Sequence, residues 1–83
     1  MMDREKINVV AHNSFQLSTF CLNNSLMMSQ VRHIRSPDNL FGVWRGRLII
    51  LEGAENKAWF DRMMLEAQRR GLVISRMGAG DRL

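Results

Sequence analysis

Residues 47–74 read RLIILEGAENKAWFDRMMLEAQRRGLVI, and this stretch decides which fold the sequence predicts. Two short apolar runs, 47–51 and 72–74, have the length and β-branched content of buried strands. Between them, apolar residues recur with the period of an amphipathic helix over about 54–70, and Gly71 follows where helices commonly end. The stretch therefore predicts a strand, one long helix and a second strand, joined by tight connections.

Residues 14–22 supply a further sheet element, because the alternate positions starting at Phe15 share one face of a strand. Two asparagines follow, and asparagine tolerates the positive φ of a two-residue hairpin turn. The favoured interpretation is a hairpin whose return strand runs over 25–35. The competing interpretation makes 26–35 a helix that Pro37 ends.

The remaining apolar runs complete the expected sheet. β-branched residues at 7–10 predict a strand, and a further strand at 40–44 would turn back into 47–51. The sum is a small α+β domain, with a mostly antiparallel sheet of about four to six strands. One long α-helix, about 54–70, packs on one face of that sheet.

The chain length of 83 residues allows a single domain. We expect residues 1–83 to form one α+β unit, with a short flexible N-terminus and a C-terminal tail from about residue 77. A chain of this size buries roughly 60–65% of its extended surface, which supports one modest core. Little chain is left for a deep active site, so we expect function on the surface.

Features of the whole sequence bear on the compartment. The N-terminal residues are charged and precede no apolar segment of signal-peptide length. The longest apolar run, 48–51, is far shorter than the roughly 20 residues of a membrane helix. The single cysteine, Cys21, excludes an intramolecular disulfide and suits a reducing compartment. These features predict a cytoplasmic protein without a membrane partner.

Residues that could carry chemistry are few. The two histidines, His12 and His33, have no neighbouring ligands at zinc-site spacing. Cys21 lies between Phe20 and Leu22, which predicts a buried apolar thiol rather than a nucleophile. No nucleophile-elbow or phosphate-loop motif occurs, and a small enzyme would need a histidine within hydrogen-bond reach of an acid. We therefore expect no catalytic residues, no metal, no cofactor and no enzyme activity.

Arginine supplies ten of the twelve basic residues, and the net charge is +4. The partner-binding residues that we predict combine arginine with one aromatic ring: Trp44, Arg45, Arg47, Arg32 and Arg35. Strand alternation puts Arg45 and Arg47 on one face and Trp44 on the other. Such a group can act as edge charges that keep a small sheet from pairing, as a protein interface, or as a surface for phosphates and bases.

These features favour a non-enzymatic binding protein that docks on a larger protein or nucleoprotein complex as an inhibitor or adaptor. Nucleic-acid binding through the same residues is the alternative, although no RNA- or DNA-recognition motif accompanies them. In size and organisation the chain is similar to small phage-encoded proteins that inhibit host or defence machinery, anti-CRISPR proteins among them. That resemblance implies a protein that acts by covering a surface. An exposed strand edge and a small core also leave a homodimer open.

Overall fold

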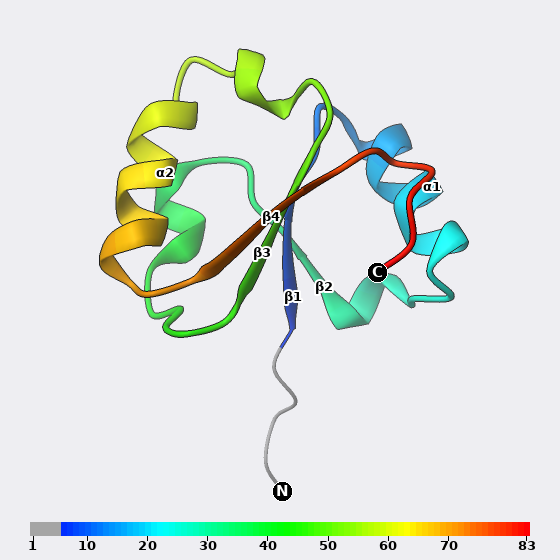
Figure 1. The fold of residues 1–83 in the computed structure, drawn as a ribbon, viewed down its shortest axis with the longest axis horizontal. Helices are drawn as coiled ribbons and strands as arrows, with labels where there is room; N and C mark the ends of the chain where they lie inside the picture. Colours follow the sequence, from blue (N-terminus) through cyan, green and yellow to red (C-terminus); the bar gives the residue numbers. More distant parts are fainter. Residues whose placement is uncertain (1–5) are drawn as a thin grey trace, which may run out of the picture.

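The structure is a computed structural model that describes residues 6–83, so the predicted flexible N-terminus lies mostly outside the described residues. Two α-helices and a four-stranded sheet form the framework of the described chain (Figure 1). In chain order they are β1 (Ile7–Val10), α1 (Ser14–Asn23), β2 (Val31–His33), β3 (Arg47–Leu51), α2 (Phe60–Arg69) and β4 (Val73–Met77). Short 3₁₀ turns lie at Met28–Gln30, Pro37–Leu40 and Ala54–Asn56.

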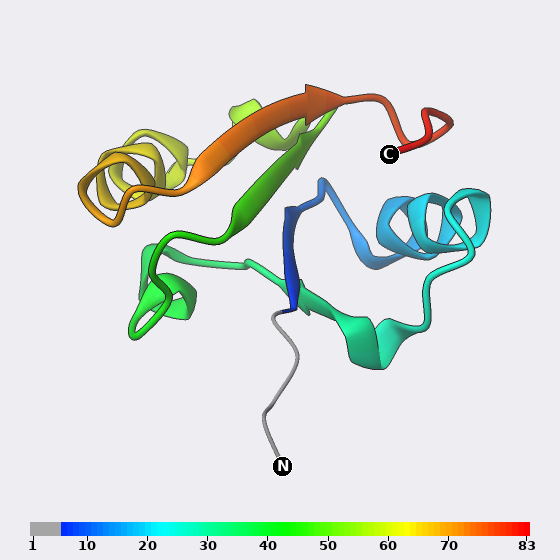
Figure 2. The same cartoon turned by 60° about the horizontal axis from the view of Figure 1, so that its bottom comes forward.

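All neighbouring strands of the sheet run parallel, in the order β2-β1-β3-β4. From β1 the chain passes through α1 to β2, crosses to β3 on the other side of β1, and continues through α2 to β4. The two β–α–β units therefore wind outward from the centre, and their helices lie at opposite sides of the molecule (Figure 1, Figure 2). As a consequence, the carboxyl ends of all four strands share one edge of the sheet.

Alternate strand residues feed two cores, one on each face of the sheet. One core joins Val10 of β1 to Met63 of α2, and the other joins Val9 of β1 to Phe20 of α1. Both valines have 0% exposure, as expected for central parallel strands covered on two faces. The side chain of Asn8 is also buried and donates from Nδ2 to the carbonyl oxygen of Arg47 at 2.9 Å, which links β1 to the start of β3.

The predicted antiparallel sheet and its hairpin are wrong, because the first arm of the hairpin forms α1. Asn13 caps this helix, since its side-chain oxygen accepts a hydrogen bond from the N–H of Gln16 at 2.8 Å. The residues fit both periods: Leu17 and Cys21 share one face of a strand and also one face of a helix. The helix in addition buries Phe20, which a strand would turn to the opposite face.

The predicted long helix over 54–70 is wrong in length. α2 spans Phe60–Arg69, and the segment before it contains the 3₁₀ turn Ala54–Asn56. Gly53 has a φ of 91° and turns the chain away from β3 into that segment. Ala54 is buried in the same core as the apolar residues of α2. The apolar pattern of the sequence therefore extends beyond the helix, which is why the predicted helix is too long.

Residues 26–35 and 40–44 also differ from the predictions. Neither a full return strand nor a helix occupies 26–35, because the turn Met28–Gln30 leads directly into the short strand β2. No strand forms over 40–44. The turn Pro37–Leu40 leads instead into a loop in which Gly42 has a φ of 82°, a backbone conformation that a regular strand does not contain.

Three predicted strands are confirmed. The runs 7–10, 47–51 and 72–74 correspond to β1, β3 and β4. Beyond β4 the chain turns, and the N–H of Gly78 donates to the carboxylate of Asp81 at 2.7 Å. The sequence therefore locates these strands, while the direction in which they pair comes from the crossing helices.

Candidate functional site

The loop before β3 packs tightly against the connection between α2 and β4. The backbone N–H of Arg45 donates to the carbonyl of Arg70 at 3.0 Å, and that of Val73 donates to Gly46 at 2.8 Å. Gly46 suits this close packing, since a Cβ added to it would lie 3.4 Å from the side-chain Nδ2 of Asn8. The loop is thus fixed at the amino ends of β3 and β4.

Two exposed aromatic rings of this loop flank Arg70. The Arg70 guanidinium lies 4.9 Å from the ring centroid of Trp44 and 5.7 Å from that of Phe41, and its Nε donates to Glu66 at 3.2 Å. The Arg70 side chain is only 13% exposed, whereas Phe41 and Trp44 are 85% and 61% exposed. The rings therefore cover the arginine and face solvent themselves. We define the aromatic–arginine patch as Phe41, Trp44, Arg45, Arg47 and Arg70.

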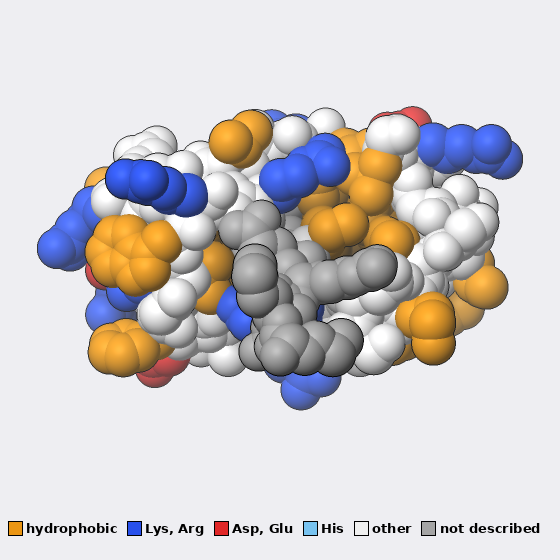
Figure 3. All heavy atoms as spheres, turned by 90° about the horizontal axis from the view of Figure 1, so that it is seen from below, with side chains coloured by type: hydrophobic (Ala, Val, Ile, Leu, Met, Phe, Trp, Pro, Cys, Tyr) orange, Lys and Arg blue, Asp and Glu red, His pale blue; other side chains and the backbone are white. Residues whose placement is uncertain are grey.

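The surface at the amino ends of the strands combines apolar and basic side chains. Figure 3 shows hydrophobic side chains set among Lys and Arg on the side where α2 lies, with few acidic ones between them. Within residues 6–83, Glu66 pairs with Arg69 and Arg70, and neither Arg45 nor Arg47 takes part in an ion pair. The patch therefore presents positive charge and apolar surface together.

The five residues predicted from the sequence do not form one surface. Trp44, Arg45 and Arg47 lie together at the amino end of β3. Arg32 lies within β2, and Arg35 follows the carboxyl end of that strand. Because β2 runs parallel to β3, the chain leaves β2 at the opposite edge of the sheet from the one where it enters β3.

Phe41 and Arg70 belong to the patch, although neither is among the five partner-binding residues predicted from the sequence. In the sequence, Arg70 is explained as a cation near the carboxyl end of a helix, where it interacts favourably with the helix dipole. That explanation gives no reason to expect a contact with a distant loop. Phe41 does offer a signal. It lies beside Gly42, shortly after a Pro-Asp-Asn turn, and an aromatic residue in such a stretch points to loop surface rather than to core.

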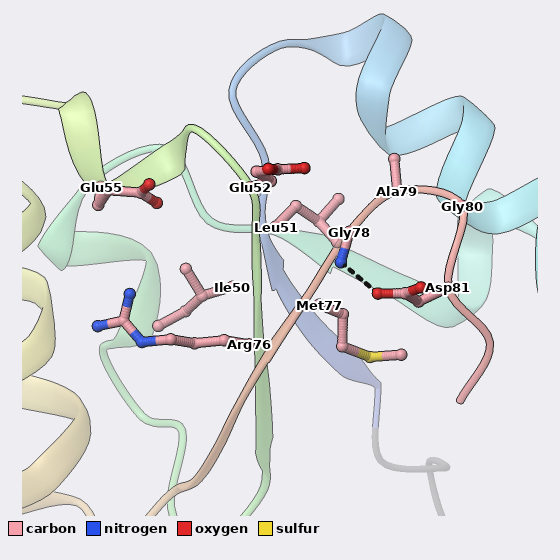
Figure 4. Close-up of a pocket in the computed structure, with 10 residues that line it drawn as sticks. All are labelled: Ile50, Leu51, Glu52, Glu55, Arg76, Met77, Gly78, Ala79, Gly80 and Asp81. Carbon is pink, nitrogen blue, oxygen red and sulfur yellow. Dashed lines mark hydrogen bonds between the residues drawn. The ribbon is translucent and has the colours of Figure 1, made fainter.

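Hollows line the opposite, carboxyl edge of the sheet. One hollow, of about 620 Å³, lies where β3 and β4 end, and its lining includes Glu52, Glu55, Arg76 and Asp81. Figure 4 shows Arg76 and Asp81 on opposite sides of the end of β4, with the two glutamates above. Among residues 6–83, no group of three or more His, Cys, Asp or Glu side chains is placed to hold a metal ion.

A second hollow, of about 380 Å³, lies between the ends of β1 and β3, where the strand order reverses. Gln16 of α1 forms hydrogen bonds to both sides of this hollow. The side-chain oxygen of Gln16 accepts from the N–H of His12 at 2.6 Å, and its amide donates to the carbonyl of Glu52 at 2.6 Å. Phe15 and Thr19 of the same helix add to the lining.

A third hollow, of about 360 Å³, lies where β1 and β2 end, and we call it the basic hollow; its wall contains His33, Arg35, Lys57 and Trp59. The Nε of Arg35 donates to Nδ1 of His33 at 3.2 Å. The pKa of His33 lies below its ordinary value because the ring is partly buried and because Arg35 and Lys57 add positive charge, while a hydrogen bond with the Ala11 backbone acts in the opposite direction. The lowered pKa favours the neutral imidazole of His33.

Cys21 lies away from all three hollows, inside the core beneath α1. Burial raises the pKa of its thiol, which disfavours the reactive thiolate. The prediction of a buried apolar thiol is confirmed, with an exposure of 3%.

Comparison with known proteins supplies no relative. No protein-family model, curated protein or solved structure matches the chain. In the described part of the chain, none of the helices combines the length and the apolar content needed to cross a bilayer. Function therefore has to be inferred from the patch and the hollows.

Proposed function

We propose that this protein is a non-enzymatic binding protein that docks on a larger protein, as an inhibitor or adaptor, through the aromatic–arginine patch. The observation that carries the proposal is the exposure of Phe41 and Trp44 around a nearly buried Arg70. Two exposed rings leave a large apolar area in contact with water. Trp and Arg are also enriched among the residues that contribute most to protein interfaces.

Contacts within the chain hold Arg70 of the patch against Trp44 and Phe41. Glu66 holds Arg70 at 3.2 Å, and the backbone of Arg45 bonds to the carbonyl of Arg70 at 3.0 Å. A guanidinium over an exposed aromatic ring adds about 0.5–1 kcal/mol. Side chains that already occupy their bound rotamers lose little entropy on docking, so a prearranged patch favours affinity.

The charge of the patch indicates the chemistry of the partner surface. Arg45 and Arg47 are exposed, and within residues 6–83 neither has an acidic partner. They flank two rings that need an apolar slot. A complementary partner is therefore a folded protein with an apolar groove and Asp or Glu side chains on its rim.

Nucleic-acid binding is the alternative for the same residues, and the net charge of +4 favours it. However, Arg70 is already engaged by Glu66 and by the two rings, which leaves Arg45 and Arg47 for phosphates. Two neutralised phosphates predict about a tenfold loss of affinity between 50 and 200 mM salt. Four arginines, as predicted from the sequence, would give a loss of about a hundredfold.

The first experiment compares two double variants by affinity capture and mass spectrometry from cells that make the protein. Trp44→Ala/Arg47→Ala is expected to lower the amount of captured partner by about tenfold or more, since it removes one ring and one charge from the patch. Phe15→Ala/Arg82→Ala is the matched control, because it removes an exposed ring from α1 and a charge from the C-terminal segment. This control is expected to retain the partner.

Two further measurements make the outcome decisive. A photo-reactive residue in place of Phe41 should cross-link to the captured protein, and nuclease treatment should leave the complex intact. Capture that survives the Trp44/Arg47 change, or that nuclease abolishes, contradicts the proposal. All four substituted side chains are exposed, so both variants should keep the circular dichroism spectrum of the parent. Loss of the Trp44–Arg70 contact should lower the free energy of unfolding by only about 0.5–1 kcal/mol.

A further inference from the structure

The basic hollow lies at the opposite end of the sheet from the aromatic–arginine patch and has the features of a ligand site. Its volume of about 360 Å³ falls in the range of small-molecule sites. In open parallel sheets, ligands bind outside the carboxyl ends of the strands where the strand order reverses. The basic hollow adjoins that point, since His12 and Asn13 line both it and the hollow between β1 and β3. The segments after β1, after β2 and before α2 meet here, so three separate parts of the chain build the wall.

Positive charge dominates this wall. Arg35 and Lys57 carry this charge, and no Asp or Glu is among the described residues that line the hollow. The guanidinium and ammonium groups therefore have no counter-charge within the hollow. Such a wall favours an anionic occupant, and a phosphate group suits it because arginine binds phosphate oxygens through two parallel hydrogen bonds.

Arg35 is held in place by its neighbours. Its Nε donates to Nδ1 of His33 at 3.2 Å, and its backbone N–H donates to the side-chain oxygen of Asn39 at 2.6 Å. Asn39 also accepts from the N–H of Ser36 at 3.1 Å, which fixes the loop that follows β2. Within residues 6–83, no hydrogen bond occupies the two terminal amino groups of Arg35, so they are left to bind an anion.

Trp59 gives the same hollow an aromatic wall. The ring is partly buried and packs against the core beneath α2, and Ala11 and Ile34 line the hollow with it. A planar organic group can stack on the accessible part of such a ring. The hollow thus offers a cationic part and an aromatic part within one small volume.

We infer that the basic hollow binds a small phosphate monoester with a planar organic group, a nucleoside monophosphate by chemical class. Arg35 and Lys57 bind the phosphate, His33 orients Arg35, and Trp59 packs against the planar group. This binding site is independent of the protein interface proposed above, because it uses other residues at the other end of the strands.

The test titrates adenosine monophosphate into the full-length ¹⁵N-labelled protein and follows the Trp59 indole and the His33 imidazole by NMR. Both signals should shift in a saturable manner, while the indole of Trp44, at the other end of the sheet, should stay constant. Inorganic phosphate should bind more weakly, and adenosine, which lacks the phosphate, more weakly still.

The bound anion should also raise the pKa of His33, because it favours the imidazolium form. The other charged or titratable groups that line the hollow are Arg35 after β2, Lys57 ahead of α2 and His12 after β1. A shift of the His33 titration with adenosine monophosphate but not with adenosine is expected.

Matched charge variants separate a built site from attraction by net charge. Arg35→Gln and Lys57→Gln should each weaken binding by about tenfold, as expected for a charge-assisted hydrogen bond. Arg82→Gln removes the same charge from the C-terminal segment and should change the Kd by less than about twofold. Lys57→Gln alone decides the matter if Arg35→Gln disturbs the loop after β2.

Four results would overturn the inference. They are the absence of a saturable shift at millimolar adenosine monophosphate, equal affinity for adenosine and its monophosphate, and equal losses in the Arg35, Lys57 and Arg82 variants. The fourth is tighter binding of an oligonucleotide without a terminal phosphate, which would assign the hollow to a phosphodiester chain.

Discussion

Arg70 shows how one residue joins two parts of the chain at the amino end of the sheet. It follows α2, yet its guanidinium lies against Trp44 and Phe41 of the loop before β3. One buried Nη of Arg70 has no hydrogen-bond partner among residues 6–83, so the rings and Glu66 hold the side chain. A single residue therefore joins the exposed rings to the end of α2.

The titration of His33 makes the free energy of unfolding depend on pH. Its pKa is lowered in the folded protein by burial, then by Arg35 and Lys57, whereas the unfolded ring titrates at about pH 6.5. The unfolded state thus binds protons more readily, so the free energy of unfolding is highest above about pH 6.5 and falls as the pH decreases below that value. His33→Gln should flatten this part of the profile, measured by urea unfolding at several pH values.

The control for this prediction is His12→Gln. His12 is exposed on the loop after β1. The His12→Gln variant keeps His33, so its free energy of unfolding should still fall as the pH decreases below about 6.5. If His33→Gln also keeps the parent's slope, or if stability rises as the pH falls toward 5, the explanation from burial and positive neighbours is wrong.

At the scale of elements, the sequence predicts where strands lie better than how they pair. The apolar runs of β1, β3 and β4 are evident in the sequence, because buried strands need them whatever their direction. Parallel pairing depends on a helix that crosses between two strands, and α1 is hidden because its apolar residues also alternate. Once α1 is read as a hairpin arm, an antiparallel sheet follows.

The candidate site shows the same limit. Trp44, Arg45 and Arg47 are neighbours in sequence, so they stay together in any fold, whereas Arg35 depends on the direction of β2. Arg70 joins the patch through a tertiary contact, which no local pattern predicts. Local sequence therefore predicts that Trp44, Arg45 and Arg47 lie together. The positions of Arg35 and Arg70 relative to them depend on strand direction and on tertiary contacts.

Gln16 connects α1 to the segments that follow the two central strands, β1 and β3. Its side chain bonds to the N–H of His12 after β1 and to the carbonyl of Glu52 after β3. Gln16→Ala removes both bonds, and we expect a loss of about 1–2 kcal/mol in the free energy of unfolding. Urea titration followed by circular dichroism measures this loss.

The matched control for that change is Gln68→Ala on the exposed face of α2. Alanine is a better helix former than glutamine, so this control should leave stability unchanged or slightly higher. A Gln16→Ala variant that is as stable as Gln68→Ala would show that the two short bonds contribute nothing measurable.

For the whole molecule, the parallel sheet separates two kinds of surface. The aromatic–arginine patch lies at the amino ends of the strands, and the basic hollow lies at their carboxyl ends. Both rest on the same central strands, since β1 and β3 contribute side chains to the core beneath each helix. A rigid sheet therefore holds the two regions apart.

The shared strands also predict that the two cores unfold together. Cys21 lies in the core beneath α1, and Trp59 borders the core beneath α2. Because neither core can open without disturbing β1 and β3, alkylation of Cys21 in increasing urea should have the same midpoint as the fluorescence of Trp59. A Trp44→Phe background isolates the Trp59 signal, and Trp44 is exposed enough for this exchange to be mild.

The reaction of Cys21 reports opening of the core because the native thiol is protected twice. It is 3% exposed, and burial raises its pKa, so both access and the thiolate fraction increase on unfolding. An alkylation midpoint below the fluorescence midpoint would show that α1 leaves the sheet first. The chain would then contain two cooperative units. In that case, a ligand in the basic hollow would protect Cys21 from alkylation only if the ligand also held α1 against the sheet.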